Sequence, residues 1–569
     1  VAARIAGDDR WIAIEDVARY RDGVGVSPPT GVPAAFLGPA VGALDGLLAR
    51  FARTHGPFLT PEPARRWGLP LGVVGDALER LLDAGTILRG EFRPGGAERD
   101  WIDPDVLRLL RRRSLARLRK EVEPVDPAAF ARFLPAWQGV AAVGDAPAPL
   151  GPTAALERLA EVIDQLAGVA LPASVLERDI LPARVPGYQP RLLDELGALG
   201  EVTWVGRGSL GRDDGRVVLL RPGRDLLRPT SLVDPADRPA GPRHDVIREH
   251  LAARGASFYR ELFAAAGGGS DREVLDALWD LVWAGEVTND TFAPLRALRW
   301  KRPARDPRRR GPGRLTSLGP PEAAGRWSLV PPPSGSPTER LHAIALGLLD
   351  RHGIVTREAV AGEGVDGGFS AVYPILRALE DAGRIRRGYF IDGLGAAQFA
   401  LAGAIERLRS VRDPGRDAAD RTVHLLAAAD PANPYGAAIA WPRRGEDDRR
   451  ALQRAAGAHV VVVDGVAALY VDRGGGSIQV LPAADDPGIG EIAARTLGRL
   501  VGDGRTRELV ITKVDGGPVA ESPFRERLIA AGFVPGYRGL VLRPVPAARE
   551  RDGPRGPIAR ITARRAGPG

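Results

Sequence analysis

A short pattern that ends a helix and begins a strand recurs at four widely spaced places in the chain. The pattern is Leu-x-x-x-Gly-x-Ile/Val, and a glycine in this position is typical of the left-handed residue that closes a helix. Recurrence of one unit along a chain indicates a tandem array of similar modules. The four copies run from Leu81 to Ile87, from Leu196 to Val202, from Leu281 to Val287 and from Leu379 to Ile385.

The residues around the first copy predict what the repeated unit is. Apolar side chains recur at helical spacing over 41–51 and over 74–82, and residues 60–68 predict a short helix between these two. A β-hairpin over 86–102 follows, with its turn at Arg93-Pro94-Gly95-Gly96. Three helices followed by a β-hairpin form a winged helix, which is a helix-turn-helix variant.

We therefore predict an α+β protein in which tandem winged-helix modules precede a β-rich domain. A fifth copy of the pattern, Leu528 to Val534, lacks the helices that should come before it, so the modules number four or five. The four complete modules occupy residues 40–103, 152–222, 243–298 and 337–402.

The remaining segments differ from the modules in composition and periodicity. Apolar residues alternate with polar ones over 420–545, which predicts a β-barrel or an α+β domain with a hairpin turn at Asp464-Gly465. The other segments are interpreted as the end of a preceding domain with a linker (1–39), a basic connecting helix and a Trp-Gln segment (104–151), a basic linker rich in proline and glycine (299–336) and a disordered tail (546–569).

The composition excludes several classes of site. The chain of 569 residues has no cysteine, so it has no disulfide, no thiolate metal site and no cysteine nucleophile. No apolar run approaches the ~18 residues that a membrane-spanning helix needs, and we expect a cytoplasmic protein without membrane contact. The chain begins at Val1 without a methionine, and we interpret it as part of a longer protein.

Motifs for nucleotide hydrolysis and metal binding are missing from the sequence. No Gly-x-x-x-x-Gly-Lys phosphate loop is present, so we expect no ATP hydrolysis by this chain. The seven histidines include no pair at i, i+4 that could share a metal ion. Gly206-x-Gly208-x-x-Gly211 has dinucleotide-binding spacing, but a strand rather than a helix is predicted to follow it. The turn-rich segment from Asp430 to Gly436 is interpreted either as a rigid structural loop or as a ligand loop.

The basic side chains are almost all arginines, and they lie outside the helices that would read DNA bases. Only three of the 79 basic residues are lysines. One interpretation of this preference is coding bias, since 71 glycines and 50 prolines accompany the arginines. The third helix of each module carries more acidic than basic residues, whereas arginine favours bidentate contacts with phosphates. We therefore predict sequence-independent binding to the DNA backbone, with the third helices used to pack modules or subunits. The candidate nucleic-acid-binding residues are Arg89, Arg93 and Arg99 on the first wing, Arg111, Arg112 and Arg113 on the connecting helix, Arg308, Arg309 and Arg310 in the linker, and Arg384, Arg386 and Arg387 on the fourth wing.

Six further segments carry a family resemblance. They are Arg10 to Ala13, Glu91 to Gly96, Arg113 to Ala116, Phe133 to Val140, Leu181 to Val185 and Asp430 to Gly436. Together they resemble the C-terminal region of the bacterial large helicase-related proteins, Lhr. In that family a superfamily 2 motor uses ATP and Mg²⁺ to move 3′ to 5′ along DNA, and a C-terminal series of winged helices with a β-barrel promotes oligomerisation. The resemblance implies that DNA, the family's own motor and further copies of the chain are partners, and that cofactors belong to the motor alone.

The same region of the family is similar to the AlkZ-type DNA glycosylases, which use a Gln-x-Gln or Gln-x-Asp pair at the lesion. By this resemblance the pair falls at Gln138 and Val140, so that Gln138 is the candidate catalytic residue and the second polar side chain is missing. The alternative is structural, with Trp137 packed in an interface and Gln138 bonded to the backbone. We predict weak or absent base excision that depends on Gln138.

The family resemblance implies the first two of three candidate functions, and the residue patterns alone allow the third. The first is the DNA-binding and oligomerisation region of an Lhr-type DNA helicase involved in DNA repair, whose motor is absent from this chain. The second is an AlkZ-like glycosylase that acts on uracil or alkylated bases. The third is a tandem winged-helix scaffold or regulator, since a fold by itself does not specify a function.

Overall fold

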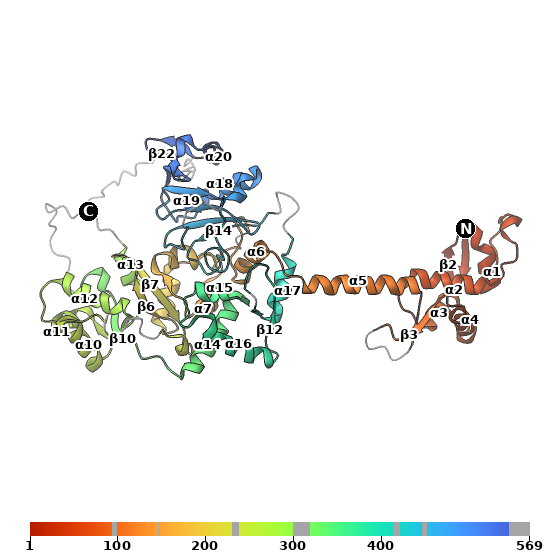
Figure 1. The fold of residues 1–569 in the computed structure, drawn as a ribbon, viewed down its shortest axis with the longest axis horizontal. Coiled ribbons are helices and arrows are strands. Elements are labelled where there is room, and N and C mark those ends of the chain that lie inside the picture. The colour runs from red at the N-terminus through yellow and green to blue at the C-terminus, as the bar shows by residue number, and fades with distance from the viewer. Residues whose placement is uncertain are drawn as a thin grey trace, which may run out of the picture. The chain divides into compact units, whose positions relative to one another are not determined.

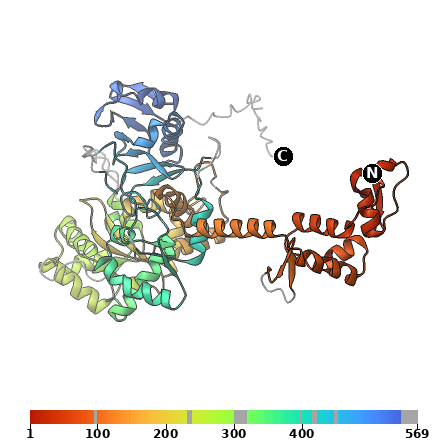
Figure 2. The same ribbon diagram turned by 45° about the vertical axis from the view of Figure 1, so that its right-hand side comes forward.

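The computed structural model describes residues 1–93, 99–145, 147–229, 238–299, 319–395, 397–413, 421–445 and 452–544. The chain forms two compact units, Val1–Glu123 and Pro124–Gly569, which Figures 1 and 2 draw from two sides. Within the described ranges, no helix combines the length and the apolar character that a bilayer crossing requires.

The first unit contains the three helices and the hairpin expected of the first module, named module 1. Its core includes Leu48, Val74, Ile87 and Trp101, each at most 2% exposed, and Phe58 forms a β-bridge with Trp101. The module consists of α2 (Ala43–Thr54), α3 (Pro61–Trp67), α4 (Leu71–Asp83), β3 (Leu88–Gly90) and β4 (Asp100–Ile102). It is preceded by β1 (Ala2–Ile5), β2 (Asp8–Trp11) and α1 (Val17–Val24) and followed by α5 (Pro104–Val122).

The second unit contains the elements of the three other expected modules, named modules 2, 3 and 4. Module 2 has α7 (Pro152–Leu166), β5 (Leu171–Pro172), α8 (Ala173–Val175) with η3 (Leu176–Ile180), α9 (Pro190–Ala198), β6 (Thr203–Ser209) and β7 (Gly215–Leu220). Module 3 has α10 (Pro242–Arg254), β8 (Ser257–Phe258), α11 (Tyr259–Ala265), α12 (Asp271–Trp283), β9 (Val287–Asn289) and β10 (Arg326–Leu329). Module 4 has α14 (Pro337–His352), β11 (Ile354–Val355), α15 (Arg357–Gly362), α16 (Gly368–Asp381), β12 (Arg386–Gly388) and β13 (Gln398–Ala400). In each, the last strand lies between the other two: β5-β7-β6, β8-β10-β9 and β11-β13-β12.

The glycine of the recurring pattern has the predicted left-handed conformation in every copy. The φ angles of Gly85, Gly200, Gly285 and Gly383 are 68°, 73°, 79° and 70°. In each copy the amide after the glycine donates a hydrogen bond of 2.9 Å to the carbonyl of the pattern's first leucine. This closure is the Schellman motif, and it sends the chain from the third helix directly into the wing.

The wing of module 2 and the third helix of module 3 pack closely together. A Cβ atom on Gly206 of β6 would lie 2.0 Å from the carbonyl oxygen of Val282, and one on Gly215 would lie 2.4 Å from the Trp283 ring. The glycines therefore allow two modules to approach each other. Strand β7, rather than a helix, follows Gly206-x-Gly208-x-x-Gly211, so the prediction that this segment is not a dinucleotide site is consistent with its geometry.

The C-terminal domain combines an open sheet with helices and a second small sheet. The six-stranded sheet has the order β14 (Val423–Ala427), β15 (His459–Val463), β16 (Val466–Val471), β17 (Ser477–Val480), β19 (Lys513–Val514) and β20 (Gly517–Pro518). The second sheet consists of β18 (Leu509–Ile511), β22 (Gly539–Leu542) and β21 (Val534–Gly536), and the helices are α18 (Pro487–Thr496), α19 (Gly498–Gly502) and α20 (Arg525–Ala530). Asp464 and Gly465 both have positive φ, 48° and 80°, as the predicted two-residue hairpin turn requires.

Two expectations differ from the structure. Among the described strands no pairing joins β14 to β20, so the sheet does not close, and the α+β alternative replaces the β-barrel. The return strand of module 3 is β10, which lies inside the stretch expected to be linker (299–336). It was missed because α13 (Ala293–Leu298) interrupts the wing and removes the hairpin signal. Residues 300–318, with Arg308 to Arg310, and the expected tail after 544 lie outside the described residues.

We predict that Gly206→Ala lowers the free energy of unfolding of the second unit by about 1–3 kcal/mol, because the new Cβ would overlap the Val282 carbonyl. Gly403→Ala is the matched control. Gly403 lies within α17 (Ala402–Ser410), and a Cβ added there would have no atom within 4 Å, so this change should be neutral or stabilising. Urea unfolding followed by tryptophan fluorescence measures both, and equal stability of the two variants would contradict the assigned packing.

Candidate nucleic-acid interface

Gln138 follows α6 (Pro127–Trp137) and is completely buried. Its Oε1 accepts a hydrogen bond from Nη2 of Arg184 at 2.7 Å, and its Nε2 donates to the carbonyl of Arg351 at 3.1 Å. The neighbouring Trp137 donates from Nε1 to the carbonyl of Asp350 at 2.8 Å. These contacts join α6 to modules 2 and 4, as the structural alternative describes. A catalytic role for Gln138 stays a prediction.

Arg184 of module 2 forms a buried ion pair with Asp430 of the C-terminal domain. Nη2 lies 2.6 Å from Oδ1 and Nη1 lies 3.0 Å from Oδ2, and neither side chain is more than 1% exposed. Nη1 also donates to the carbonyl of Ile180. Bidentate pairs of this kind are strong when desolvated, and removal of one partner leaves an uncompensated buried charge. The pair therefore fixes the C-terminal domain to module 2.

The loop that begins at Asp430 is held from several sides. Asp430 accepts from the amide of Ala432, and Asn433 donates to the carbonyl of Ala428. Arg454 donates to the carbonyls of Asp430, Asn433 and Tyr435. These bonds agree with the interpretation as a rigid structural loop. The other side of the loop lines a cavity, and the interpretation as a ligand loop stays a prediction.

Three of the predicted DNA-binding arginines form ion pairs at the protein surface. Arg89 pairs with Glu79 at 2.6 Å and lies 4.7 Å from the centre of the Trp101 ring. Arg93 pairs with the buried Asp100. Arg387 on the fourth wing pairs with Glu380 of α16 at 3.3 Å. Their charge is thus partly used within the module.

The remaining predicted arginines of the described chain are exposed. In module 4, the side chains of Arg384 and Arg386 make no ion pair or hydrogen bond with any described residue. In the first unit the same holds for the side chains of Arg99, Arg111, Arg112 and Arg113 within the described ranges. Exposed guanidinium groups of this kind can neutralise phosphates without first breaking an internal pair.

The acidic residues of the third helices are mostly paired with arginines of the same unit. Asp194 of α9 lies 2.7 Å from Arg296, and Glu273 of α12 lies 2.7 Å from Arg243. The end of α12 is covered by the wing of module 2. Such helices offer few donors to base edges in a major groove, which agrees with the expectation that they pack modules together. Backbone-directed binding stays a prediction.

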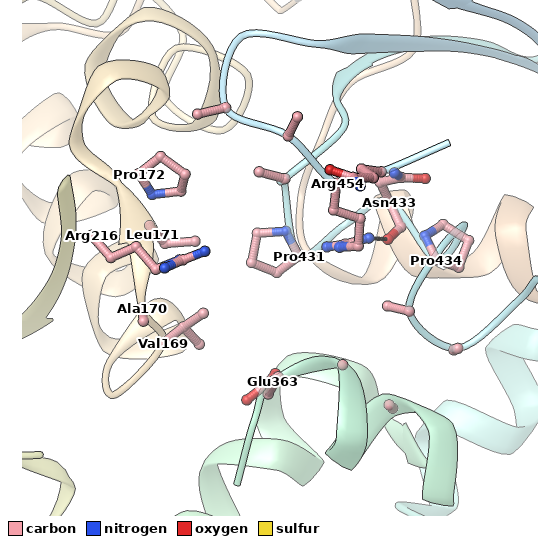
Figure 3. A pocket seen from close by; sticks show the side chains of 18 of the residues that line it. Val169, Ala170, Leu171, Pro172, Arg216, Glu363, Pro431, Asn433, Pro434 and Arg454 are labelled. Carbon is pink, nitrogen blue, oxygen red and sulfur yellow. Dashed lines mark hydrogen bonds between the residues drawn. The ribbon is translucent and has the colours of Figure 1, made fainter. Parts of the chain in front are cut away.

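Modules 2 and 4 and the C-terminal domain together line a cavity of about 640 Å³. Figure 3 shows the guanidinium groups of Arg216 and Arg454 entering it from opposite sides, with Pro431 between them and Glu363 on the module 4 side. Arg473 also lines the cavity. Apolar walls are supplied by Val169, Leu171, Pro172, Leu210 and Pro434.

The charges around this cavity are not balanced. Glu363 accepts from Nη2 of Arg351 and from Nε2 of His352, each at 2.6 Å. Burial alone would raise the pKa of Glu363, but Arg351 and His352 outweigh it and hold that pKa well below its usual range. Burial lowers the pKa of Arg454 to about 10, so this group is still mainly charged at neutral pH. With Glu363 already paired, the cavity carries a net positive charge.

Sequence reasoning missed Arg216, Arg454 and Arg473 as candidate site residues. Arg216 was visible only as one residue of a wing strand, and Arg473 lies beyond β16 in a turn. Arg216 is separated from the other two by more than two hundred positions in the chain, and no local pattern joins them. Only the packing of three domains around one space brings them together.

Comparison with known protein families gives three matches. Residues 1–39, 125–222 and 334–420 match models described as "Large helicase-related protein, winged-helix domain", for its second, third and fourth such domains in chain order. The resemblance found in the sequence is confirmed by these matches.

Two curated proteins are similar over nearly all of this chain. One, from Mycolicibacterium smegmatis, is named "Lhr helicase/ probable uracil glycosylase" and is 43% identical. The other, from Escherichia coli, is named "Lhr helicase/uracil glycosylase" and is 36% identical. Each alignment covers 95% of this chain and 36% of the relative, so the chain spans about a third of the length of the relatives it matches.

We predict that Gln138→Ala lowers the free energy of unfolding by about 1.5–3 kcal/mol, because the buried Arg184 guanidinium loses a hydrogen-bond acceptor. Gln165→Ala is the matched control, since Gln165 also donates to a backbone carbonyl of module 4, but at the surface. The control should change stability by no more than about 0.5 kcal/mol. Denaturant unfolding measures both, and a Gln138 variant as stable as the control would show that the network contributes little.

Proposed function

Because the chain carries winged-helix domains of the large helicase-related proteins, we propose that it is the DNA-binding region of a helicase of that kind. The motor, its use of ATP and Mg²⁺, its 3′-to-5′ movement and its part in DNA repair belong to this proposal for the whole protein. The supporting observation in the chain itself is the set of exposed arginines on the module 4 wing and on α5 that have no partner among the described residues. This region would hold DNA while the motor moves along it.

The mode of binding follows from where the charges lie. Arg384 and Arg386 project from the start of the module 4 wing, whereas the carboxylates of the adjoining α16 pair with Arg377 and Arg387. Contacts from arginine to phosphate do not distinguish base pairs. We therefore propose binding that is independent of sequence and weakened strongly by salt.

The salt dependence of DNA binding tests this proposal. Replacing both Arg384 and Arg386 with alanine should lower the slope of log affinity against log salt by roughly 2, because each phosphate contact contributes roughly 1. Arg387→Ala is the matched control on the same wing, since its charge is already paired with Glu380, and it should lower the slope by clearly less than about 1. Fluorescence anisotropy with duplexes of unrelated sequence measures these slopes.

A substitution in the third helix of module 4 tests the opposite possibility, that the modules read base pairs in a groove. Arg377 lies on α16 with its side chain 65% exposed, where a helix that reads a groove would use it. We expect the Arg377→Ala variant to keep most of its affinity for DNA and to bind duplexes of different sequence equally well. An unchanged slope in the double wing variant, together with binding lost in Arg377→Ala, would mean that the modules read grooves.

Base excision is a second candidate function. It is supported by the names of the two relatives, both of which include uracil glycosylase. The proposal predicts alkali-sensitive breaks at uracil in DNA incubated with the purified chain, and none where thymine replaces uracil. Breaks that persist in Gln138→Ala, per folded molecule, would argue against the predicted catalytic role of Gln138. The absence of any breaks would leave DNA binding as the function.

The proposal also includes self-association, which the family resemblance implies. Multi-angle light scattering of the purified chain distinguishes an oligomer from a monomer. A monomer at all concentrations would remove this part of the proposal without affecting DNA binding. The third function, a scaffold or regulator without a motor, is set aside because both similar proteins are named as helicases.

A further inference from the structure

The cavity between modules 2 and 4 and the C-terminal domain has the size of a small-molecule site. Its volume of about 640 Å³ falls within the range of roughly 300–1,000 Å³ that is usual for ligand pockets. One wall is aliphatic, formed by Val169, Leu171, Pro172 and Pro431, and none of the described lining residues is a Phe, Tyr or Trp. The cavity can therefore enclose a flat, weakly polar group.

The rim of the cavity is suited to an anion. Arg216 and Arg473 are exposed, and within the described residues their side chains have no ion pair or hydrogen bond. Arg454 donates only to backbone carbonyls among the described residues, and Asp430 and Glu363 attract it without forming an ion pair with it. A phosphate placed between these groups would form charge-assisted hydrogen bonds.

The interior also holds a polar group without a partner. His352 is 5% exposed and lines the cavity, with its Nε2 bonded to Glu363 at 2.6 Å. Its Nδ1 is buried and has no hydrogen-bond partner in the described structure. A buried nitrogen of this kind is costly to leave unpaired, and it can bond the polar edge of a ligand.

A smaller cavity of about 290 Å³ adjoins the first one, with Ala170 and Glu363 lining both. It is lined by Arg207 on the wing of module 2 and by Arg340 on α14. Within the described chain Arg207 makes no ion pair, and Nε of Arg340 is buried without a partner. Asp366 lines the same cavity and attracts Arg207, so the positive charge that continues along this wing from the rim of the larger cavity is partly offset.

We propose that the larger cavity receives one nucleotide extruded from a bound DNA strand. The base lies against the aliphatic wall within reach of His352, and its phosphate contacts Arg216 and Arg473. The phosphates of the adjoining nucleotides follow Arg207 and Arg340. This inference rests on the proposed DNA binding, and it adds a specific site that holds an unpaired base.

Extrusion costs a few kcal/mol for a paired base and least for one that is already unpaired. The site should therefore act on a nucleotide that has lost its partner. Because no described aromatic side chain lines the cavity, an extruded base would leave its stacked neighbours without gaining a new aromatic contact. That environment predicts a rise in the fluorescence of 2-aminopurine, which stacking quenches.

The test uses a duplex in which 2-aminopurine faces an abasic site, titrated with the whole chain to saturation. We expect a severalfold rise in fluorescence with the unchanged chain. The Arg216→Ala and Arg473→Ala double variant should lose most of this rise, while its overall affinity falls by no more than roughly tenfold because only a few of many phosphate contacts are removed. A full rise in this variant would overturn the assignment.

The wing variant of module 4, Arg384→Ala with Arg386→Ala, is the matched control. It should need more protein to reach saturation and then give the full rise, because it changes backbone contacts outside the cavity. If the unchanged chain does not bind DNA at all, the proposed function fails. If it binds and gives no rise, only the nucleotide site fails.

A free nucleotide carries the same base and phosphate groups as an extruded one and is the alternative ligand of this cavity. Isothermal titration with thymidine monophosphate in the absence of DNA distinguishes the two sources. We expect no measurable heat of binding at micromolar concentrations. Tight binding that is lost in the Arg216 and Arg473 double variant would mean that the cavity takes a free nucleotide, and the extrusion proposal would be overturned.

Discussion

Within the second unit, a buried ion pair between Arg184 and Asp430 joins module 2 to the C-terminal domain. Two charges removed from water destabilise a protein unless the geometry is good and the remaining donors are satisfied. Here the pair is bidentate, and Gln138 and the carbonyl of Ile180 accept further hydrogen bonds from the same guanidinium. Because the partners come from the end of α6, module 2 and the C-terminal domain, this network joins three parts of the chain.

The cavity forms where modules 2 and 4 pack against the C-terminal domain. Asp430 begins the loop whose carbonyls hold Arg454, and the same loop supplies Pro431, Asn433 and Pro434 to the cavity wall. Module 4 contributes His352 and Glu363. The carboxylate of Glu363 is paired with Arg351 and with His352. Among the described residues, the internal pairing of the acidic groups leaves Arg216 and Arg473 without an ion pair. The structure thus separates arginines that hold parts of the chain together, such as Arg184 and Arg454, from exposed arginines such as Arg216 and Arg473.

Much of the architecture could be predicted from local signals. The pattern around Gly85, Gly200, Gly285 and Gly383 predicted where third helices end and wings begin, because only a left-handed residue allows that closure. The turn at Asp464-Gly465 was equally local. The return strand β10 and the openness of the C-terminal sheet were not predictable in this way, since strand pairing at long range leaves no mark in the nearby sequence. Among the candidate arginines, the sequence could not distinguish Arg387, which is paired, from Arg386, which is exposed.

The sequence by itself determined the winged-helix repeat, the absence of cysteine chemistry and of a phosphate loop, and an arginine excess outside the third helices. These properties depend on residue types and on spacings of a few positions, so the sequence alone is enough to predict them. Only the tertiary structure decided that Gln138 contacts a buried guanidinium, and that Arg216, Arg454 and Arg473 surround one space. The reason is physical: burial, charge pairing and the shape of a cavity are set by residues hundreds of positions apart, which meet only after the modules have packed.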